Sequence, residues 1–252
     1  DLGIIFDTDV DRAGAVLSDG TELNRNRIIA MMAAILLREH PGTTIVTDSI
    51  TSTGLAAFIR KHGGVHHRFK RGYRNVINES MRLNREGHDS QLAMETSGHG
   101  ALKENYFLDD GAYLVTRLLI ELARAKKEGY TLESLIADLA EPAESKEFRM
   151  NILVPDFKAY GQKIIDELNI YAASQPGWSV APDNFEGVRV NLDKAHGDGW
   201  FLLRLSLHDP LIPLNIESDS VGGVRQIAAE LAPFLRPFDQ LDTSALLAFA
   251  GC

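Results

Sequence analysis

Three aspartates near the start of the chain, Asp7, Asp9 and Asp11, have the residue type and the spacing of a cation site. They follow the apolar run 4–6 and alternate with other residues. Alternate residues of an extended segment point to the same side, so we expect the three carboxylates to converge at the end of a strand. Oxygen ligands alone favour Mg²⁺ or Ca²⁺ over zinc. The alternative is a solvated acidic turn, and Arg12, directly after the third aspartate, argues against it.

A second loop whose residues could bind a ligand or take part in catalysis is METSGHGALKE, residues 94–104, at the end of another predicted strand. Glu95 and Ser97 can hydrogen-bond to sugar hydroxyls, and His99 can move a proton near neutral pH. Open α/β sheets bind ligands outside the carboxyl ends of their strands, which is where this loop is expected. Taken alone, the same trio is also typical of an ordinary turn with a surface histidine.

A third loop is RLSLHDP, residues 204–210, between two predicted antiparallel strands. Arg204 can make bidentate contacts to a phosphate group, and Ser206 can donate its hydroxyl. Backbone N–H groups of the turn can add further donors. The alternative is a hairpin in which Arg204 forms a surface ion pair with Asp209.

A smaller signal is FKRGYRN, residues 69–75, where three cations surround a glycine before a predicted helix. Lys70 and Arg71 at such a helix start are expected to bind an anion. An ordinary solvated loop has the same composition.

The elements that must position these loops alternate between strands and helices in the first half of the chain. The predicted strands are 2–6 (buried), 15–18, 43–49, 65–70 and 90–96, and the predicted helices are 25–38, 53–62, 75–86 and 109–126. Such alternation predicts βαβ units. The first half is therefore expected to be an α/β domain, with a mostly parallel sheet and helices on both faces.

The pattern changes at AEPAESKEF, residues 140–148, which is charged, contains a proline and is our predicted linker. Beyond it we predict strands at 147–153, 187–193, 199–206 and 211–218, and helices at 156–168 and 221–235. Consecutive strands with short loops indicate an antiparallel sheet with helices packed on one side. This part is expected to be a smaller α+β domain.

Composition narrows the class of partner. The chain has 252 residues and a formal net charge of -9, with scattered basic residues and few aromatic ones, so we expect no nucleic-acid partner. A local basic pocket can still bind a small anionic substrate. No apolar run is long enough for a membrane helix, so no membrane partner is expected either. The single cysteine, Cys252, allows no internal disulfide, which fits a cytoplasmic protein.

Together and in this order, the three loops resemble those of the α-D-phosphohexomutases, the phosphoglucomutase/phosphomannomutase family. Its magnesium loop, D-x-D-x-D-R, resembles residues 7–12, and its sugar loop, G-E-x-S-G-H, resembles residues 94–99. Its phosphate loop, R-x-S-x-T-x-P, is matched in part by residues 204–210. Each motif is weak alone, but their order and spacing are specific, and the resemblance covers residues 3 to 235.

The resemblance implies a position within a four-domain protein. Residues 1–15 would be the end of the second domain with the metal loop, 16–140 the third domain with the sugar loop, and 147–252 the fourth domain with the phosphate loop. The chain starts without Met, and we interpret it as the C-terminal part of a longer protein. The family's first domain, which carries the phosphoserine, would then lie upstream, so the missing N-terminal domains are expected partners and this chain alone is expected to be inactive.

The residues also depart from the family pattern. Met94 replaces the first glycine of the sugar loop, Tyr73 stands where a histidine is common, and Ile50 lies where a lysine is often found. In the phosphate loop, the segment 207–209 replaces small and hydroxyl residues, and we expect His208 to substitute for the lost donor. These differences concern phosphate binding and the choice between glucose and mannose phosphates.

The resemblance implies a mutase that interconverts hexose 1-phosphate and hexose 6-phosphate through a bisphosphate intermediate. Mg²⁺, held by the three aspartates, would offset charge on the transferring group. Arg12 would assist there, and His99 would be the general acid or base. The sugar and its phosphates would be bound by six further residues and by His208: Glu95, Ser97, Lys70, Arg71, Arg204 and Ser206.

Two other classes remain open at this point. A strand followed by D-x-D also resembles the HAD phosphatases, in which Asp7 would be the nucleophile. That interpretation leaves the sugar and phosphate loops unexplained. The other class is a non-catalytic module that binds a phosphosugar.

Overall fold

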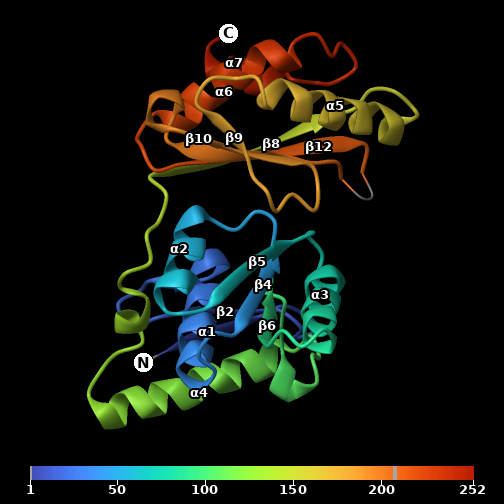
Figure 1. Cartoon of the computed structure of the whole chain (residues 1–252). Helices are drawn as coiled ribbons and strands as arrows, with labels where there is room; N and C mark the ends of the chain where they lie inside the picture. The colour runs from blue at the N-terminus through green and yellow to red at the C-terminus, as the bar shows by residue number, and fades with distance from the viewer. Residues whose placement is uncertain (1, 207–208) are drawn as a thin grey trace. The chain divides into compact units, whose positions relative to one another are not determined.

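The computed structural model of the chain describes residues 2–206 and 209–252 (Figure 1). The chain is divided into two compact units, Asp1–Ala140 and Glu141–Cys252. Each unit has its own buried apolar core.

A four-stranded sheet forms the centre of the first unit. Its strands lie in the order β5 (Val65–Phe69), β4 (Thr44–Asp48), β6 (Ser90–Met94) and β7 (Gly100–Leu102). The first three run parallel, and β7 folds back antiparallel to β6. The strands β4 and β6 are buried along their whole length, as expected where helices cover both faces of a sheet.

Helices cover both faces of this sheet. They are α1 (Arg25–Glu39), α2 (Thr53–Lys61), α3 (Tyr73–Arg85) and α4 (Gly111–Glu128), with short 3₁₀ turns at Lys103–Asn105 and Glu133–Ile136. Successive residues of β4 point to opposite faces. Ile45 joins the core under α1, α2 and α4, whereas Val46 joins the core under α3. The predicted α/β class, with a mostly parallel sheet between helices, is confirmed.

A separate three-stranded antiparallel sheet begins the chain. It consists of β1 (Gly3–Phe6), β2 (Ala13–Val16) and β3 (Glu22–Leu23), with β1 at its edge. The prediction that 2–6 is a buried strand is wrong in this respect, because β1 is exposed throughout and the Ile5 side chain is 62% accessible. Its apolar run resembles a core strand, but β1 pairs only with β2 and lies outside the parallel sheet.

The second unit is a five-stranded antiparallel sheet with helices on one face, in agreement with the predicted α+β class (Figure 1). Its strand order is β8 (Glu144–Asn151), β12 (Leu211–Ser218), β11 (Gly199–Leu203), β10 (Val188–Leu192) and β9 (Trp178–Val180). The helices are α5 (Phe157–Ala172), α6 (Gly223–Leu235) and α7 (Ser244–Ala250), with a 3₁₀ turn at Lys194–His196.

The first strand of this unit starts inside the predicted linker. Glu144 already pairs with Ser218, and charged side chains alternate with buried Phe148 and Met150 along β8. A charged edge strand of this kind is easily mistaken for a linker, because its outward side chains resemble those of a loop. Among the described residues, no helix is both long and apolar enough to cross a membrane.

Candidate functional site

The three aspartates lie in the turn of the β1–β2 hairpin, whose strands pair from Gly3 with Val16 to Phe6 with Ala13. The sequence argument expected an extended segment, but the backbone turns, and Val10 adopts a left-handed φ of 64°. The turn nevertheless brings one carboxylate oxygen from each of Asp7, Asp9 and Asp11 within 4.8 Å of the others. Convergence therefore comes from the turn and not from strand alternation.

Arg12 closes this turn onto its first aspartate. Its backbone N–H donates to Asp7 Oδ1 at 3.2 Å, and its Nε donates to Asp7 Oδ2 at 2.7 Å. Desolvation raises the pKa of Asp7, but these hydrogen bonds and the guanidinium charge outweigh it and hold that pKa below its usual value. Asp7 is therefore ionised over the physiological pH range.

The third aspartate presents an oxygen that suits a cation. Asp11 Oδ1 is buried and accepts no hydrogen bond from the described residues, and Arg12 Nε lies 3.8 Å from it. A buried carboxylate oxygen without a donor is costly unless something positive binds it. The Asp11 carboxylate also clusters with those of Asp7 and Asp9, and this all-oxygen group fits a hard divalent cation.

The predicted sugar loop is a tight turn between β6 and β7. The Glu95 N–H donates to the His99 carbonyl at 2.9 Å, and the Gly98 N–H donates to the Glu95 carbonyl at 3.1 Å. The Glu95 carboxylate is buried and accepts the Gly72 N–H at 2.6 Å and the Ser97 hydroxyl at 3.2 Å. Ser97 itself is exposed, so its hydroxyl is accessible to a ligand.

The β1–β2 hairpin that carries the predicted metal ligands, called the metal hairpin below, pairs directly with the predicted sugar loop. Arg12 forms an antiparallel bridge with His99, and the Ala13 N–H donates to the Gly98 carbonyl at 3.3 Å. A hollow of about 250 Å³ lies where the two loops meet, and its lining includes Asp7, Arg12 and Ser97. The structure thus brings together the predicted metal ligands and the predicted sugar loop within the first unit.

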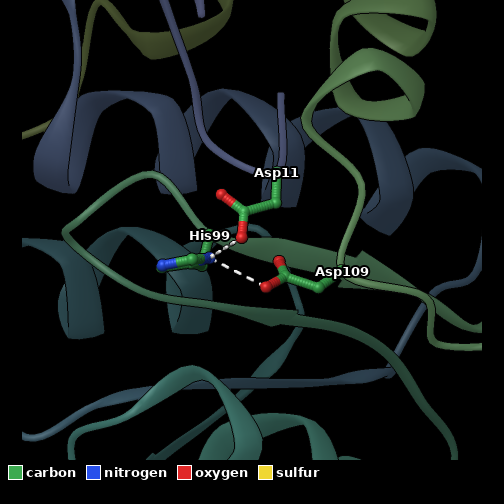
Figure 2. Close-up of side chains that lie close together, drawn as sticks. All are labelled: Asp11, His99 and Asp109. Carbon is green, nitrogen blue, oxygen red and sulfur yellow. Dashed lines mark hydrogen bonds and ion pairs between the residues drawn. The ribbon is translucent and has the colours of Figure 1, made fainter. Parts of the chain in front are cut away.

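His99 lies between two carboxylates, as Figure 2 shows. Its Nδ1 is 2.8 Å from Asp109 Oδ2 and 3.7 Å from Asp11 Oδ2. The ring of Tyr73 stacks on the imidazole with 4.9 Å between the ring centroids. The residue at the position where the family often has a histidine therefore packs against the candidate acid or base.

The first residue of α4 packs against the turn of the metal hairpin. The Gly111 N–H donates to the Val10 carbonyl at 3.1 Å, and a Cβ at residue 111 would lie 2.8 Å from that oxygen. Only glycine allows this approach without a shift of the backbone. Asp110 caps the helix by accepting the Tyr113 N–H at 2.9 Å. The short segment Asp109-Asp110-Gly111 thus supports the sugar loop and the metal loop together.

A buried carboxylate that sequence reasoning missed lies at the end of β4. The Asp48 side chain is fully buried, and burial, with a smaller contribution from the charge of Glu95, raises its pKa to about 6. Arg71 Nε lies 3.9 Å from Asp48 Oδ2. Of the two predicted anion-binding cations, Arg71 therefore faces this carboxylate and Lys70 is exposed. The only sequence signal for Asp48 was its place at the end of a β-branched strand.

The predicted phosphate loop connects β11 to β12 in the second unit. The Arg204 N–H donates to the Pro213 carbonyl at 3.2 Å, and the Ser206 N–H donates to the Leu211 carbonyl at 3.0 Å. Gly187, at φ +60°, packs against Arg204, since a Cβ there would lie 2.7 Å from the Arg204 Cα. The side chains of Arg204 and Ser206 are partly exposed. The predicted donor His208 lies outside the described residues.

Comparison with known proteins shows which family this chain resembles in sequence and fold. The family model described as phosphoglucomutase/phosphomannomutase, alpha/beta/alpha domain III, matches residues 24–142. A phosphoglucomutase from Neisseria meningitidis serogroup A is 29% identical over 228 residues, which are 90% of this chain and 46% of that protein. A phosphomannomutase/phosphoglucomutase from Pseudomonas putida is 32% identical over 229 residues, 90% of this chain and 45% of that protein.

A solved structure is similar over nearly the whole chain. The phosphoglucomutase/phosphomannomutase family protein from Burkholderia thailandensis is 28% identical, with a TM-score of 0.76, over 96% of this chain and 48% of that one. The chain spans about half the length of the relatives it matches.

Proposed function

Because the chain belongs to the phosphoglucomutase/phosphomannomutase family, we propose that it forms part of a mutase that moves a phosphoryl group between O1 and O6 of a hexose phosphate. The substrate is a hexose phosphate, and the phosphoserine that donates the phosphoryl group lies in upstream domains of the same protein. This chain contributes the metal, sugar and phosphate loops.

One observation carries the proposal. The carboxylates of the metal hairpin and the polar residues of the sugar loop belong to two segments about 90 residues apart, yet backbone pairing joins them at Arg12 and His99. A site for a phosphosugar requires cation ligands and hydroxyl-binding groups around the same hollow, since the charge and the hydroxyls of the ligand must be bound at the same time. A plain phosphatase would need the acidic turn but not the sugar loop.

The metal in the proposal is Mg²⁺, held by Asp7, Asp9 and Asp11. These residues fit it because they offer three carboxylates and the buried Asp11 Oδ1 atom. When bound, Mg²⁺ supplies positive charge opposite the transferring phosphoryl group. Arg12, already ordered by its contacts with Asp7, places a guanidinium at the same hollow.

The remaining residues orient the sugar and move protons. The Ser97 hydroxyl accepts a hydrogen bond from the sugar, because its own proton is donated to Glu95, which also holds Gly72 in place. His99 takes the proton from the attacking hydroxyl and returns it to the departing oxygen. In the second unit, Arg204 and Ser206 bind a phosphate group. Lys70 and Arg71 bind an anionic group of the substrate, and Arg71 lies near Asp48 at the end of β4.

The test is a coupled assay that converts glucose 1-phosphate to glucose 6-phosphate. The longer protein that contains this chain should turn over, and Asp9→Ala should abolish its activity. Asp19→Ala removes an acidic turn residue that is outside the metal cluster, so this matched control should remain active. The 252-residue chain alone should be inactive, even with Mg²⁺ and a hexose 1,6-bisphosphate, because its aspartates are assigned to the metal and no phosphoryl acceptor remains.

The phosphatase alternative has its own test. Beryllium fluoride mimics a phosphoryl group and should form an adduct on Asp7 if that residue is a nucleophile. We expect no adduct, because both Asp7 oxygens already accept hydrogen bonds from Arg12. Turnover by the purified chain together with an Asp7 adduct would refute the mutase proposal.

A further inference from the structure

Asp109 holds two hydrogen-bond donors at once. Its Oδ2 lies 2.8 Å from His99 Nδ1, and its Oδ1 accepts the Gly100 N–H at 3.2 Å. Asp109 is itself fixed, because its backbone bridges to Ala101 and the next N–H, of Asp110, donates to the Gly100 carbonyl at 3.2 Å. The carboxylate is therefore held by the backbone fold-back of β7 and not by its own rotamer alone.

This contact decides which nitrogen of His99 carries the proton. An ionised carboxylate only accepts hydrogen bonds, so Nδ1 must donate and a neutral ring must leave Nε2 unprotonated. Asp11 cannot take over this role, because its nearest oxygen is 3.7 Å from Nδ1, beyond hydrogen-bonding distance. Figure 2 shows the second ring nitrogen pointing away from both carboxylates.

The surroundings keep the ring in this orientation. The side chains of His99 and Asp109 are 16% and 13% exposed, and Tyr73 stacks on the imidazole plane. A ring held at one edge by a hydrogen bond and on one face by an aromatic side chain has little freedom to flip.

We propose that Asp109 is a positioning residue: it fixes His99 in the tautomer with Nδ1 protonated and presents Nε2 as the proton acceptor. The proposal rests on the proposed function only for what Nε2 does, because the tautomer follows from the hydrogen bond alone. A partner that fixes both the tautomer and the orientation of a histidine is a general requirement when that histidine exchanges protons.

The first test is the tautomer of His99 in the 252-residue chain, read from its long-range ¹H–¹⁵N spectrum at the alkaline end of a pH series, where the spectrum itself shows that the ring is neutral. The wild-type spectrum should show a protonated Nδ1 and an unprotonated Nε2. The opposite tautomer, or an even mixture, would overturn the proposal without any variant.

The isosteric variant Asp109→Asn should reverse the tautomer. Gly100 offers a fixed backbone N–H, which the amide oxygen of the substituted side chain must face. The amide NH₂ group then faces His99, so Nδ1 has to accept and the proton moves to Nε2. Asp110→Asn is the matched control, because that neighbour caps α4 and does not contact His99. In the Asp110→Asn variant, His99 should keep the wild-type tautomer. A reversed His99 tautomer in this control would contradict a specific role for Asp109.

Activity of the longer protein gives the second test. Asp109→Asn should lower kcat by about 10²-fold or more with little change in KM, because proton transfer by a positioned side chain typically contributes about 10²–10⁴-fold. A reversed tautomer with an unchanged kcat would refute the catalytic role of this positioning. A wild-type protein without mutase turnover would instead refute the proposed function, and the spectra would still decide the tautomer.

Discussion

Thr96 donates two hydrogen bonds to the buried carboxylate of Asp48, one from its backbone N–H at 3.2 Å and one from its hydroxyl at 2.7 Å. The end of β4 is thereby tied to the first residue after Glu95 in the sugar loop. These donors favour the ionised form, but burial and the charge of Glu95 outweigh them, so the pKa of Asp48 is raised to about 6.

The stability of the first unit should therefore depend on Asp48 between pH 3.8 and about 6. The folded state binds this proton more tightly than the unfolded state, so the contribution is fully present below the unfolded pKa and is lost as the pH rises through the folded pKa. Over this window the wild type should lose on the order of 3 kcal/mol relative to Asp48→Asn, at about 1.4 kcal/mol for each pH unit.

Denaturant unfolding at several pH values measures this difference. Both tryptophans, Trp178 and Trp200, belong to the second unit, so fluorescence does not follow the relevant transition. Amide resonances of β4 should be used instead, together with the carboxyl resonance of Asp48. A difference between wild type and variant that stays flat across this window would contradict the raised pKa.

Mg²⁺ binding by this chain should be weak and should depend on the hairpin turn. Mg²⁺ prefers six oxygen ligands and usually combines carboxylates with waters and substrate phosphates, whereas the turn offers three carboxylates. Titration calorimetry should give an affinity weaker than about 1 μM, and Asp9→Ala or Asp11→Asn should abolish the signal. Submicromolar binding, or binding that survives both substitutions, would remove the turn as the site.

Replacing Gly111 by alanine should disturb the turn of the metal hairpin at Val10. The new Cβ would lie 2.8 Å from the Val10 carbonyl oxygen, and such overpacking typically costs about 1–3 kcal/mol. The free energy of unfolding of the first unit and the Mg²⁺ affinity should fall together. Gly14→Ala is the control, because its Cβ would come no closer than 3.8 Å to its nearest backbone neighbour, the Leu23 carbonyl, and both measurements should stay near the wild type.

Arg204→Lys should weaken phosphate binding by the second unit about ten-fold, or about 1.4 kcal/mol, because lysine keeps the charge but loses the planar fork of donors. NMR titration with glucose 6-phosphate should shift resonances of 204–206 in the wild type and shift them less in the variant. Arg149→Lys changes an exposed arginine of β8 in the same way and should have no effect. If no resonance of 204–206 shifts in the wild type, this loop does not bind the phosphate group.

The sequence predicted the elements whose patterns are local. The helix from 25 to 38 and the strand from 211 to 218 agree with α1 and β12 because long apolar or alternating runs and clear turn residues define them. The three loops were also visible, since their polar residues follow strands. Short elements such as β7 and β9 were missed, because three residues carry no recognisable period.

The contacts that organise the site were harder to predict. Asp109 was interpreted only as the start of a helix, because its contact with His99 requires β7 to fold back on β6. The burial of Asp48 depends on neighbours from β6 and on the loop before α3, and no local pattern encodes them. Whether Asp7 and its two companions bind Mg²⁺ stays a prediction until it is measured.

The pairing of Arg12 with His99 also has a consequence for protein engineering. A 94–99 loop transplanted from a relative would arrive without its supports, which lie in the 7–12 turn and in 109–111. Those two segments would have to be exchanged with it as one cassette. Conversely, a library confined to 94–99 would sample substitutions against a fixed frame, so changes at the buried Glu95 should mainly disturb folding, whereas changes at the exposed Ser97 should act on ligand binding.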